Sequence, residues 1–368
     1  MILRALGDLH PNYRPPPQNQ QIASVAFYFA EQLQQATGRR IGIVQSSYGG
    51  SPAQAWTPGW ALEARPELEH FTAALREGRR AGKSKEEWLE NAGMLARWKV
   101  ALADWEKNGQ QGPRPKNPGP PHPGNPWYSQ SPTVLYENMI APIVPFTARG
   151  VIWYQGETNA GKPEEYRVLF PAMIEAWRKV WSRPDWPFLF VQLAAYSAKA
   201  GDWPGMRAAQ VHTRDRVPYT GMAVAIDCGE KEQIHPRAKQ PVGERLARLA
   251  LGQVYGRDIV SRGPALESAS VGERGISVRF RHVAEGLRTA DGRDEVPGFE
   301  VVGSDGKFHP AQARIRRPDR VELVCDAVAS PVTVRYAWAD WVEPPVTLQN
   351  SAGLPAEPFL TAVQTRSP

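Results

Sequence analysis

Short apolar segments alternate with helical patterns across residues 22–255, and this alternation constrains the fold more than any other feature. Four apolar runs are short enough to be buried strands, at 41–44, 150–154, 187–193 and 222–227. Helical spacing of apolar residues surrounds them, at 24–37, 164–181, 206–216 and 242–255. Strands that alternate with helices predict right-handed βαβ units, so we expect an α/β fold with a parallel sheet covered on both faces.

The pattern changes after residue 260. Apolar and polar residues alternate at 276–280, 299–302, 321–325 and 332–336, with no helical pattern between these runs. The Ser304-Asp-Gly-Lys307 sequence predicts a hairpin turn, because Asp-Gly supplies the positive φ angles that such turns require. We therefore expect a small antiparallel β domain with a C-terminal tail over residues 259–368.

An insertion interrupts the α/β region. Residues 63–107 are charged and helical in spacing, and seven prolines follow between Pro113 and Pro126. Such a proline run cannot continue a helix or a central strand, so it predicts an extended loop. We expect a domain over 22–258 with a helical and proline-rich insertion at 61–130, preceded by a proline-rich segment at 1–21.

Composition excludes several classes of function. The 44 basic and 38 acidic residues give a net charge of +6, and no basic run exceeds two residues, which argues against a nucleic-acid partner. The two cysteines, expected to be buried structural thiols, form no CxxC pair, and the histidines form no HxxxH or HxH pair, so we expect no metal. No apolar run approaches the roughly 18 residues of a membrane span. No secretory signal is visible either; the protein would be periplasmic or secreted if a signal lies upstream, and cytoplasmic otherwise.

Polar or glycine-rich clusters follow three of the predicted strands. They are QSSYGGSP at 45–52, QGETN at 155–159 and DCGEKEQIHP at 227–236. Ligands bind at the carboxyl ends of the strands in an open parallel sheet. Adjacent glycines suit an oxyanion hole, and a histidine suits general-base work at neutral pH. Taken singly, each cluster is also compatible with a tight turn, a hydrogen-bonded loop or a structural histidine.

Together and in this order, the clusters resemble the sialate O-acetylesterase family within the SGNH hydrolases. The resemblance spans about residues 22–360 and implies a flavodoxin-like three-layer sandwich plus a β domain. It also implies a carboxylic ester hydrolase that removes O-acetyl groups from sialic acid or related sugars. The matching stretches are SVAFYFAEQL, IGIVQSSYGGSPAQAW, LYENMIAPI, RGVIWYQGETNA, MRAAQ, the IHP to VGERLA run of 234–247, GFEVV and GLPAEPF.

The resemblance also implies roles for individual residues. His235 would be the general base, and the Gly49 backbone N–H would be one oxyanion donor. A side-chain amide from Gln155 or Asn159 would be another donor. Glu232 stands three residues before the histidine, where the family usually has an aspartate that orients the imidazole. Other candidates for the orienting group are Glu230, Asp227 and a backbone carbonyl; no cofactor or metal is implied.

The chain departs from the family at the nucleophile, which is a serine in a GQSN-like turn after the first strand. This sequence contains no GQSN, GDSL or GxSxG motif. Residues 1–21 are too short and too rich in proline for a strand, the turn and a helix, so we expect the first strand and the nucleophile to be missing. Ser47 is the candidate substitute nucleophile. The alternatives are a non-catalytic carbohydrate-binding protein that stacks tryptophans on sugar rings, and an acetylxylan-type esterase.

Overall fold

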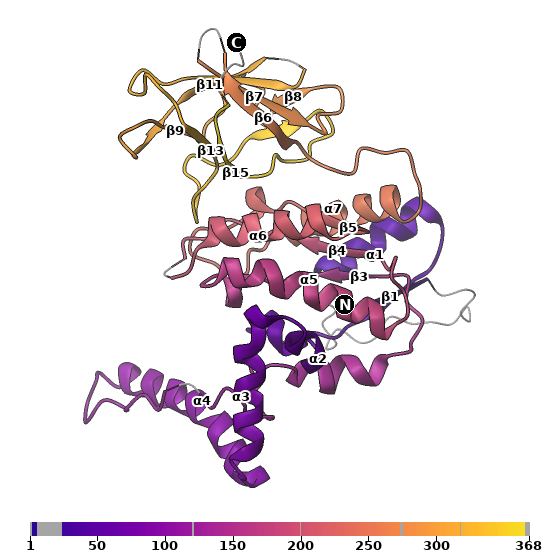
Figure 1. The fold of residues 1–368 in the computed structure, drawn as a ribbon, viewed down its shortest axis with the longest axis vertical. Coiled ribbons are helices and arrows are strands. Elements are labelled where there is room, and N and C mark those ends of the chain that lie inside the picture. The colour runs from indigo at the N-terminus through magenta and orange to yellow at the C-terminus, as the bar shows by residue number, and fades with distance from the viewer. Residues whose placement is uncertain are drawn as a thin grey trace. The chain divides into compact units, whose positions relative to one another are not determined.

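The computed structural model describes residues 2–5, 24–119, 121–198, 200–272, 275–316 and 318–364 (Figure 1). The chain divides into two compact units. We call the first the sheet unit; it comprises Met1–Gln45, Thr147–Glu164 and Asp185–Pro368. The second, the helical unit, comprises Ser46–Phe146 and Glu165–Pro184.

A five-stranded sheet, in the order β2-β1-β3-β4-β5, is the framework of the sheet unit. Its strands are β1 (Ile2–Ala5), β2 (Ile41–Val44), β3 (Gly150–Trp153), β4 (Phe188–Val191) and β5 (Thr220–Ala223). Strands β3, β4 and β5 run parallel and are fully buried, which explains their continuous apolar runs. The predicted α/β class is confirmed.

Strand β1 corrects one expectation. We expected no strand within residues 1–21, but Ile2–Ala5 pairs antiparallel with both β2 and β3. The first proline stands at position 11, so nothing in these four residues prevents strand pairing. Because β1 is antiparallel to both neighbours, β2 and β3 are parallel to each other and the sheet is mixed. Residues 6–23, the rest of the predicted proline-rich segment, lie outside the described residues.

Helices α1 (Ser24–Thr37) and α7 (Lys239–Gln253) pack against each other in the sheet unit (Figure 1). Phe29 of α1, Leu246 of α7 and Leu189 of β4 belong to one buried apolar cluster. Helix α6 (Trp203–Arg216) connects β4 to β5. The predicted strand at 222–227 is wrong in its bounds, because the strand ends at Ala223 and a 3-10 turn, Ile226–Cys228, follows.

The predicted antiparallel β region is confirmed after residue 260. One sheet has the order β11-β12-β7-β6, a second has the order β10-β9-β13-β15, and β8 pairs with β14. Gly306, at φ 70°, stands in the predicted turn between β9 and β10. The strands are β6 (Ala265–Val271), β7 (Ile276–Arg281), β8 (Leu287–Thr289), β9 (Phe299–Val302), β10 (Phe308–Pro310), β11 (Gln312–Arg316), β12 (Arg320–Val324), β13 (Thr333–Tyr336), β14 (Leu348–Asn350) and β15 (Phe359–Ala362).

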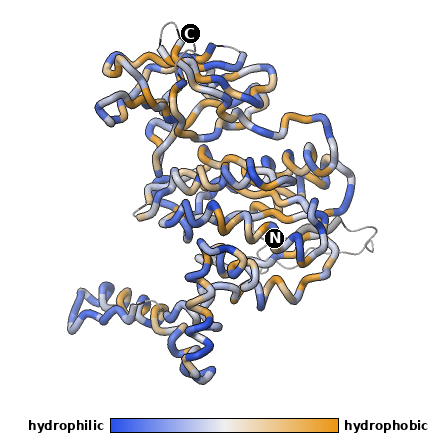
Figure 2. Tube along the Cα trace, in the orientation of Figure 1, coloured by the Kyte–Doolittle hydropathy of each residue, from blue (hydrophilic) through white to orange (hydrophobic). Residues whose placement is uncertain are grey.

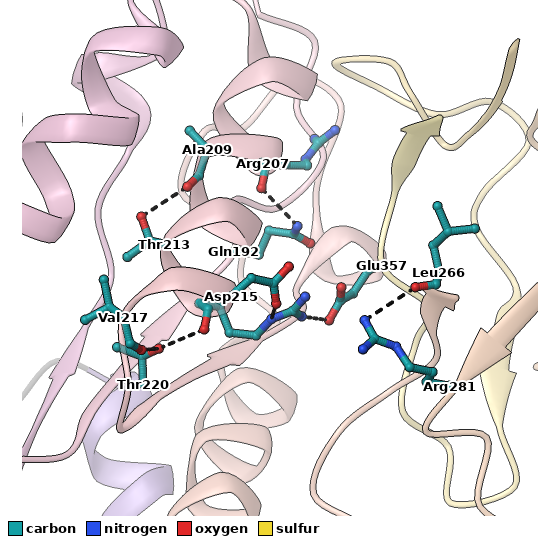
Figure 3. Close-up of polar contacts among 11 residues, drawn as sticks. Gln192, Arg207, Ala209, Thr213, Asp215, Val217, Thr220, Leu266, Arg281 and Glu357 are labelled. Carbon is teal, nitrogen blue, oxygen red and sulfur yellow. Dashed lines mark hydrogen bonds and ion pairs between the residues drawn. The ribbon is translucent and has the colours of Figure 1, made fainter. Parts of the chain in front are cut away.

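Buried polar contacts attach helix α6 to the β region within the sheet unit (Figure 3). The Arg214 guanidinium forms a buried ion pair with Glu357 and bonds Asp215 at 2.8 Å. The guanidinium of Arg207, which is fully buried, donates to the carbonyl oxygens of Ala339 at 2.7 Å and Asp340 at 3.0 Å. These contacts join α6 to segments more than a hundred residues further along the chain.

Residues 63–107 were expected to be helical, and three helices of the helical unit lie over 59–107. Helices α2 (Gly59–Glu63), α3 (Glu69–Arg80) and α4 (Lys85–Lys107) are separated by turns. A capping box starts α4, because Ser84 Oγ accepts from Glu87 N at 3.2 Å and Glu87 Oε2 accepts from Ser84 N at 2.8 Å. Helix α4 is mostly hydrophilic, whereas hydrophobic residues concentrate along the strands of the sheet unit (Figure 2). The remaining elements are helix α5 (Pro163–Val180) and short helical turns at Ala53–Trp56, Pro66–Leu68, Tyr136–Ile140, Ala141–Ile143 and Glu157–Asn159.

Candidate active site

The carboxyl ends of β2, β3, β4 and β5 lie at one edge of the sheet, because these strands run in the same direction. The segment Gln155–Asn159 leaves this edge after β3, and the loop carrying His235 leaves it after β5. Two of the three polar clusters predicted from the sequence therefore start from the same edge of the sheet, with β4 between them. Gln45 begins the third cluster, directly after β2.

The two amides after β3 are buried and bonded to each other. Gln155 Nε2 donates to Asn159 Oδ1 at 2.7 Å. This bond engages the NH₂ group of Gln155 and the carbonyl oxygen of Asn159. Gln210 of α6 supports the loop, since its Nε2 donates to Gln155 O at 3.2 Å and to Val191 O at 3.1 Å. The amides thus occupy a rigid, preorganised loop.

Glu157, His235 and Lys239 form the charged part of this site. Burial raises the pKa of the Glu157 carboxyl, while the charges of His235 and Lys239 act in the opposite direction. Burial lowers the pKa of Lys239, whose Nζ lies 5.6 Å from the centre of the Tyr154 ring. Burial, with the Glu157 charge as a smaller cause, raises the pKa of the Tyr154 hydroxyl. Glu157 is therefore a carboxyl group electrostatically coupled to the predicted general base.

His235 lies on an exposed part of the loop after β5. Its backbone N–H donates to Gln233 Oε1 at 3.5 Å, and Glu230 closes the loop by accepting from Arg237 N at 2.6 Å. Glu232 is exposed and has no hydrogen bond or ion pair among the residues that the structure describes. The structure does not join Glu232 to the imidazole through a hydrogen bond.

Asp227, an alternative partner for His235, is engaged elsewhere. Its two carboxylate oxygens accept from Arg245 Nη1 and Nη2, each at 2.6 Å. Arg245 Nη1 also donates to Val224 O at 2.7 Å and lies 3.4 Å from Cys228 Sγ. Arg245 therefore fixes the first residues of the loop that carries His235.

The cluster that contains Ser47 and Gly49 belongs to the helical unit, whereas Gln155, Glu232 and His235 belong to the sheet unit. Ser47 and Gly49 are exposed, and the adjacent Ser46 Oγ donates to Met139 O at 3.2 Å. Gly50 adopts φ 66°, which explains why glycine stands in this turn. A Cβ added at Gly49 would meet no atom within 4 Å, so the backbone there is open to approach.

Sequence reasoning missed three residues that build the site: Arg207, Gln210 and Arg245. A signal for them was present, since MRAAQ contains Arg207 and Gln210, and VGERLA contains Arg245. Their roles depend on partners that are distant in sequence. In the described ranges, no group of three or more histidine, cysteine, aspartate or glutamate residues is arranged to hold a metal ion. None of the described helices is both long and apolar enough to span a bilayer.

Comparisons with known proteins support the resemblance seen in the sequence. Residues 123–252 match the family described as carbohydrate esterase, sialic acid-specific acetylesterase. Human sialate O-acetylesterase is 27% identical over 377 residues, which cover 94% of this chain and 62% of the human protein. The mouse sialate O-acetylesterase is 31% identical over 263 residues, which cover 64% of this chain and 48% of the mouse protein.

A crystal structure of a carbohydrate acetylesterase from Xanthomonas citri is similar, with a TM-score of 0.71 and 34% identity. The match covers 92% of this chain and 65% of that one. The chain thus spans about three fifths of the length of the human relative. The motifs, the sheet and these matches agree, and the chain is similar to sialic acid-specific carbohydrate acetylesterases over most of its length.

Proposed function

We propose that this protein hydrolyses O-acetyl esters on sugars, with O-acetylated sialic acid as the first substrate to test. One observation carries the proposal: the Gln155–Asn159 amide pair follows β3 and the His235 loop follows β5, at the same edge of the sheet and with only β4 between them, in a chain that is similar to sialic acid-specific acetylesterases. Amide donors and an imidazole are the groups that acyl transfer requires beside a nucleophile. The names of the relatives supply the substrate class.

The proposed chemistry is double displacement. A serine hydroxyl attacks the acetyl carbonyl carbon while His235 takes its proton, and His235 returns that proton to the departing sugar oxygen. Water, deprotonated by His235, then attacks the acyl-serine, which releases acetate and restores the serine. The Gly49 N–H and a side-chain amide stabilise the oxyanion at both stages. The amide belongs to Gln155 or Asn159, whose side chains are bonded to each other.

Two assignments have competing candidates. Glu157 is supported as the carboxyl partner of His235 by their electrostatic interaction, while motif spacing favours Glu232. Ser47, exposed shortly after β2, is the serine that we test as nucleophile.

Acetate release from an aryl acetate and from O-acetylated sialic acid tests the proposal. If Ser47 serves as the nucleophile, we expect turnover by the wild-type chain, loss of turnover in His235→Ala, and a fall of about a hundredfold to a thousandfold in kcat for Asn159→Ala. Glu157→Gln is expected to reduce kcat more than Glu232→Gln does. Retained activity in Ser47→Ala would place the nucleophile elsewhere in the chain.

Acetylated xylan as a parallel substrate separates the two sugar classes. A folded wild-type chain that binds O-acetylated sialic acid without releasing acetate would overturn the proposal in favour of a carbohydrate-binding protein.

A further inference from the structure

We propose that the buried Ser51 hydroxyl orients the peptide that carries the Gly49 N–H, and that Trp56 holds this hydroxyl in its productive direction. The inference rests on the proposed function, in which Gly49 is an oxyanion donor. It makes Ser51 and Trp56 positioning residues, since neither contacts the reacting atoms in this scheme. All the residues involved lie in the helical unit.

A two-step hydrogen-bond relay carries the argument. Trp56 Nε1 donates to Ser51 Oγ at 2.9 Å, and Ser51 Oγ donates to Tyr48 O at 2.6 Å. Ser51 is 5% exposed and Trp56 is 3% exposed, so water does not compete strongly for either bond. An indole N–H can only donate, so the Ser51 oxygen accepts from Trp56 and its proton is directed to the Tyr48 carbonyl.

The relay fixes the direction of the Gly49 N–H through the geometry of the peptide bond. The carbonyl of Tyr48 and the N–H of Gly49 belong to one planar trans peptide, in which they point in opposite directions. Because the Tyr48 carbonyl oxygen accepts a hydrogen bond from the buried Ser51 hydroxyl, the Gly49 N–H points away from Ser51. Gly49 is exposed, and no atom lies within 4 Å of where its Cβ would be. The Gly49 N–H therefore points away from the buried Ser51 on a residue that is itself exposed.

A second clamp holds the other side of the same turn. Gln130 Nε2 donates to Gly50 O at 2.8 Å, and Tyr128 Oη donates to Gln130 Oε1 at 2.8 Å. The relay is itself anchored, because Trp177 Nε1 donates to Trp56 O at 2.9 Å. The peptide before the Gly49–Gly50 bond is thus held by Ser51 of the same turn, and the peptide after it is held by Gln130 of a distant segment.

This arrangement matters chemically because an oxyanion donor acts through preorganisation. A donor that already points at the developing charge stabilises the transition state without reorganisation, whereas a donor that must first turn loses part of that effect. A glycine turn is intrinsically permissive, so its orientation has to come from its neighbours. Ser51 and Trp56 supply this constraint.

Kinetic comparison of Ser51→Ala and Trp56→Phe with the wild-type chain tests the inference. Ser51→Ala removes both bonds of the relay, and we expect kcat to fall about tenfold to a hundredfold with KM unchanged. Trp56→Phe keeps the aromatic bulk and the Ser51 hydroxyl, so a smaller fall is expected. Thr57→Val is the matched control, since Thr57 is a fully buried residue of the same segment whose Oγ1 donates to Ala53 O at 2.9 Å, outside the relay. It should keep the wild-type kcat.

A second measurement does not depend on activity. In ¹⁵N-glycine-labelled protein, the Gly49 amide is identified by its loss in Gly49→Ala, and its order parameter is measured. We expect a value of about 0.85 in the wild-type chain and below about 0.6 in Ser51→Ala. Trp56→Phe replaces Ser51→Ala in both measurements if the latter does not fold.

The two measurements separate the relay from the proposed function. An inactive wild-type chain would contradict the proposed function, and the order parameter would still decide whether the relay orients Gly49. An active chain whose kcat and Gly49 order parameter are unchanged by Ser51→Ala would overturn the inference. Loss of order without loss of kcat would remove its catalytic part, as would an equal loss of kcat in Thr57→Val.

Discussion

At the scale of single residues, side chains of the same chemical type differ in their hydrogen-bond partners. Gln155 and Asn159 carry the same amide group, yet one uses its NH₂ to bond the other. Asp227, Glu230 and Glu232 are all acidic and close in sequence. Asp227 is held by Arg245, Glu230 by the backbone of Arg237, and Glu232 remains exposed.

The two cysteines give a pH-dependent prediction at this scale. Burial, with the Asp227 charge as a smaller cause, raises the pKa of the Cys228 thiol to about 12. Cys325 is only partly buried, contrary to our expectation that both thiols are buried. Since the thiolate is the reactive form, we expect a thiol-disulfide reagent at pH 8 to titrate one thiol in the native chain and two in guanidinium.

The raised pKa also sets the sign of the stability effect. The Cys228 contribution is fully present below the pKa of the unfolded thiol, about 9, and is lost as the pH rises toward about 12. Cys325→Ser is the control and should remove the native reaction while leaving the denatured one. Fast native labelling of Cys228 in that variant would show that the thiol is not protected.

At the scale of elements, the close approach of α7 to α1 depends on Gly243. A Cβ at this position would lie 2.6 Å from Tyr28 Cβ and 2.7 Å from Val25 O, which is closer than real contacts allow. Helix α7 also carries Arg245 and Lys239. The packing of α7 on α1 therefore determines the position of these two charges beside the His235 loop.

Gly243→Ala is therefore expected to destabilise the chain by about 1–3 kcal/mol, although alanine is the better helix former. Urea unfolding, followed by circular dichroism, measures the change. Gly93→Ala in α4 is the matched control, because the nearest atom to its Cβ is the flexible end of Arg97. The control should be neutral or slightly stabilising; equal midpoints for the two variants would contradict the packing argument.

At the scale of the whole molecule, buried charge connects segments that are far apart in sequence. Arg207 is fully buried, and burial lowers its pKa to about 10. Besides Ala339 and Asp340, its guanidinium donates to Leu193 O at 3.0 Å and Ala194 O at 3.1 Å. One side chain thus donates hydrogen bonds to carbonyl oxygens that follow β4 and to carbonyl oxygens that follow β13.

Arg207→Met would leave these buried carbonyls without their donor, and we expect a loss of about 3–5 kcal/mol in the free energy of unfolding. Thermal and urea unfolding measure it. Arg216→Met, on the exposed last turn of α6, is the control and should change stability by less than about 0.5 kcal/mol. A loss in Arg207→Met no larger than in the control would show that the carbonyls find other partners.

Sequence periodicity determined most of the secondary structure of this protein. The helix at Ser24–Thr37 and the strand at Ile41–Val44 have the predicted bounds, because a periodic apolar face marks the surface that an element buries. The Ser84 capping box that breaks the predicted helix is also encoded locally, in the S-x-x-E pattern at 84–87. The motifs at the strand ends carried the resemblance to sialate O-acetylesterases for the same reason, since each lies within a few consecutive residues.

Only the tertiary structure decided the pairing of these parts. Three contacts join residues that are distant in sequence. Strand Ile2–Ala5 pairs antiparallel with β2 and β3, Arg245 bonds Asp227, and buried Arg207 donates to the Asp340 carbonyl oxygen. Local spacing carries no record of such partners, because a polar group takes its hydrogen bonds from whatever the folded chain brings near it. The sequence by itself determined which elements form and which motifs they carry, while the folded chain decided which of their polar groups bond to one another.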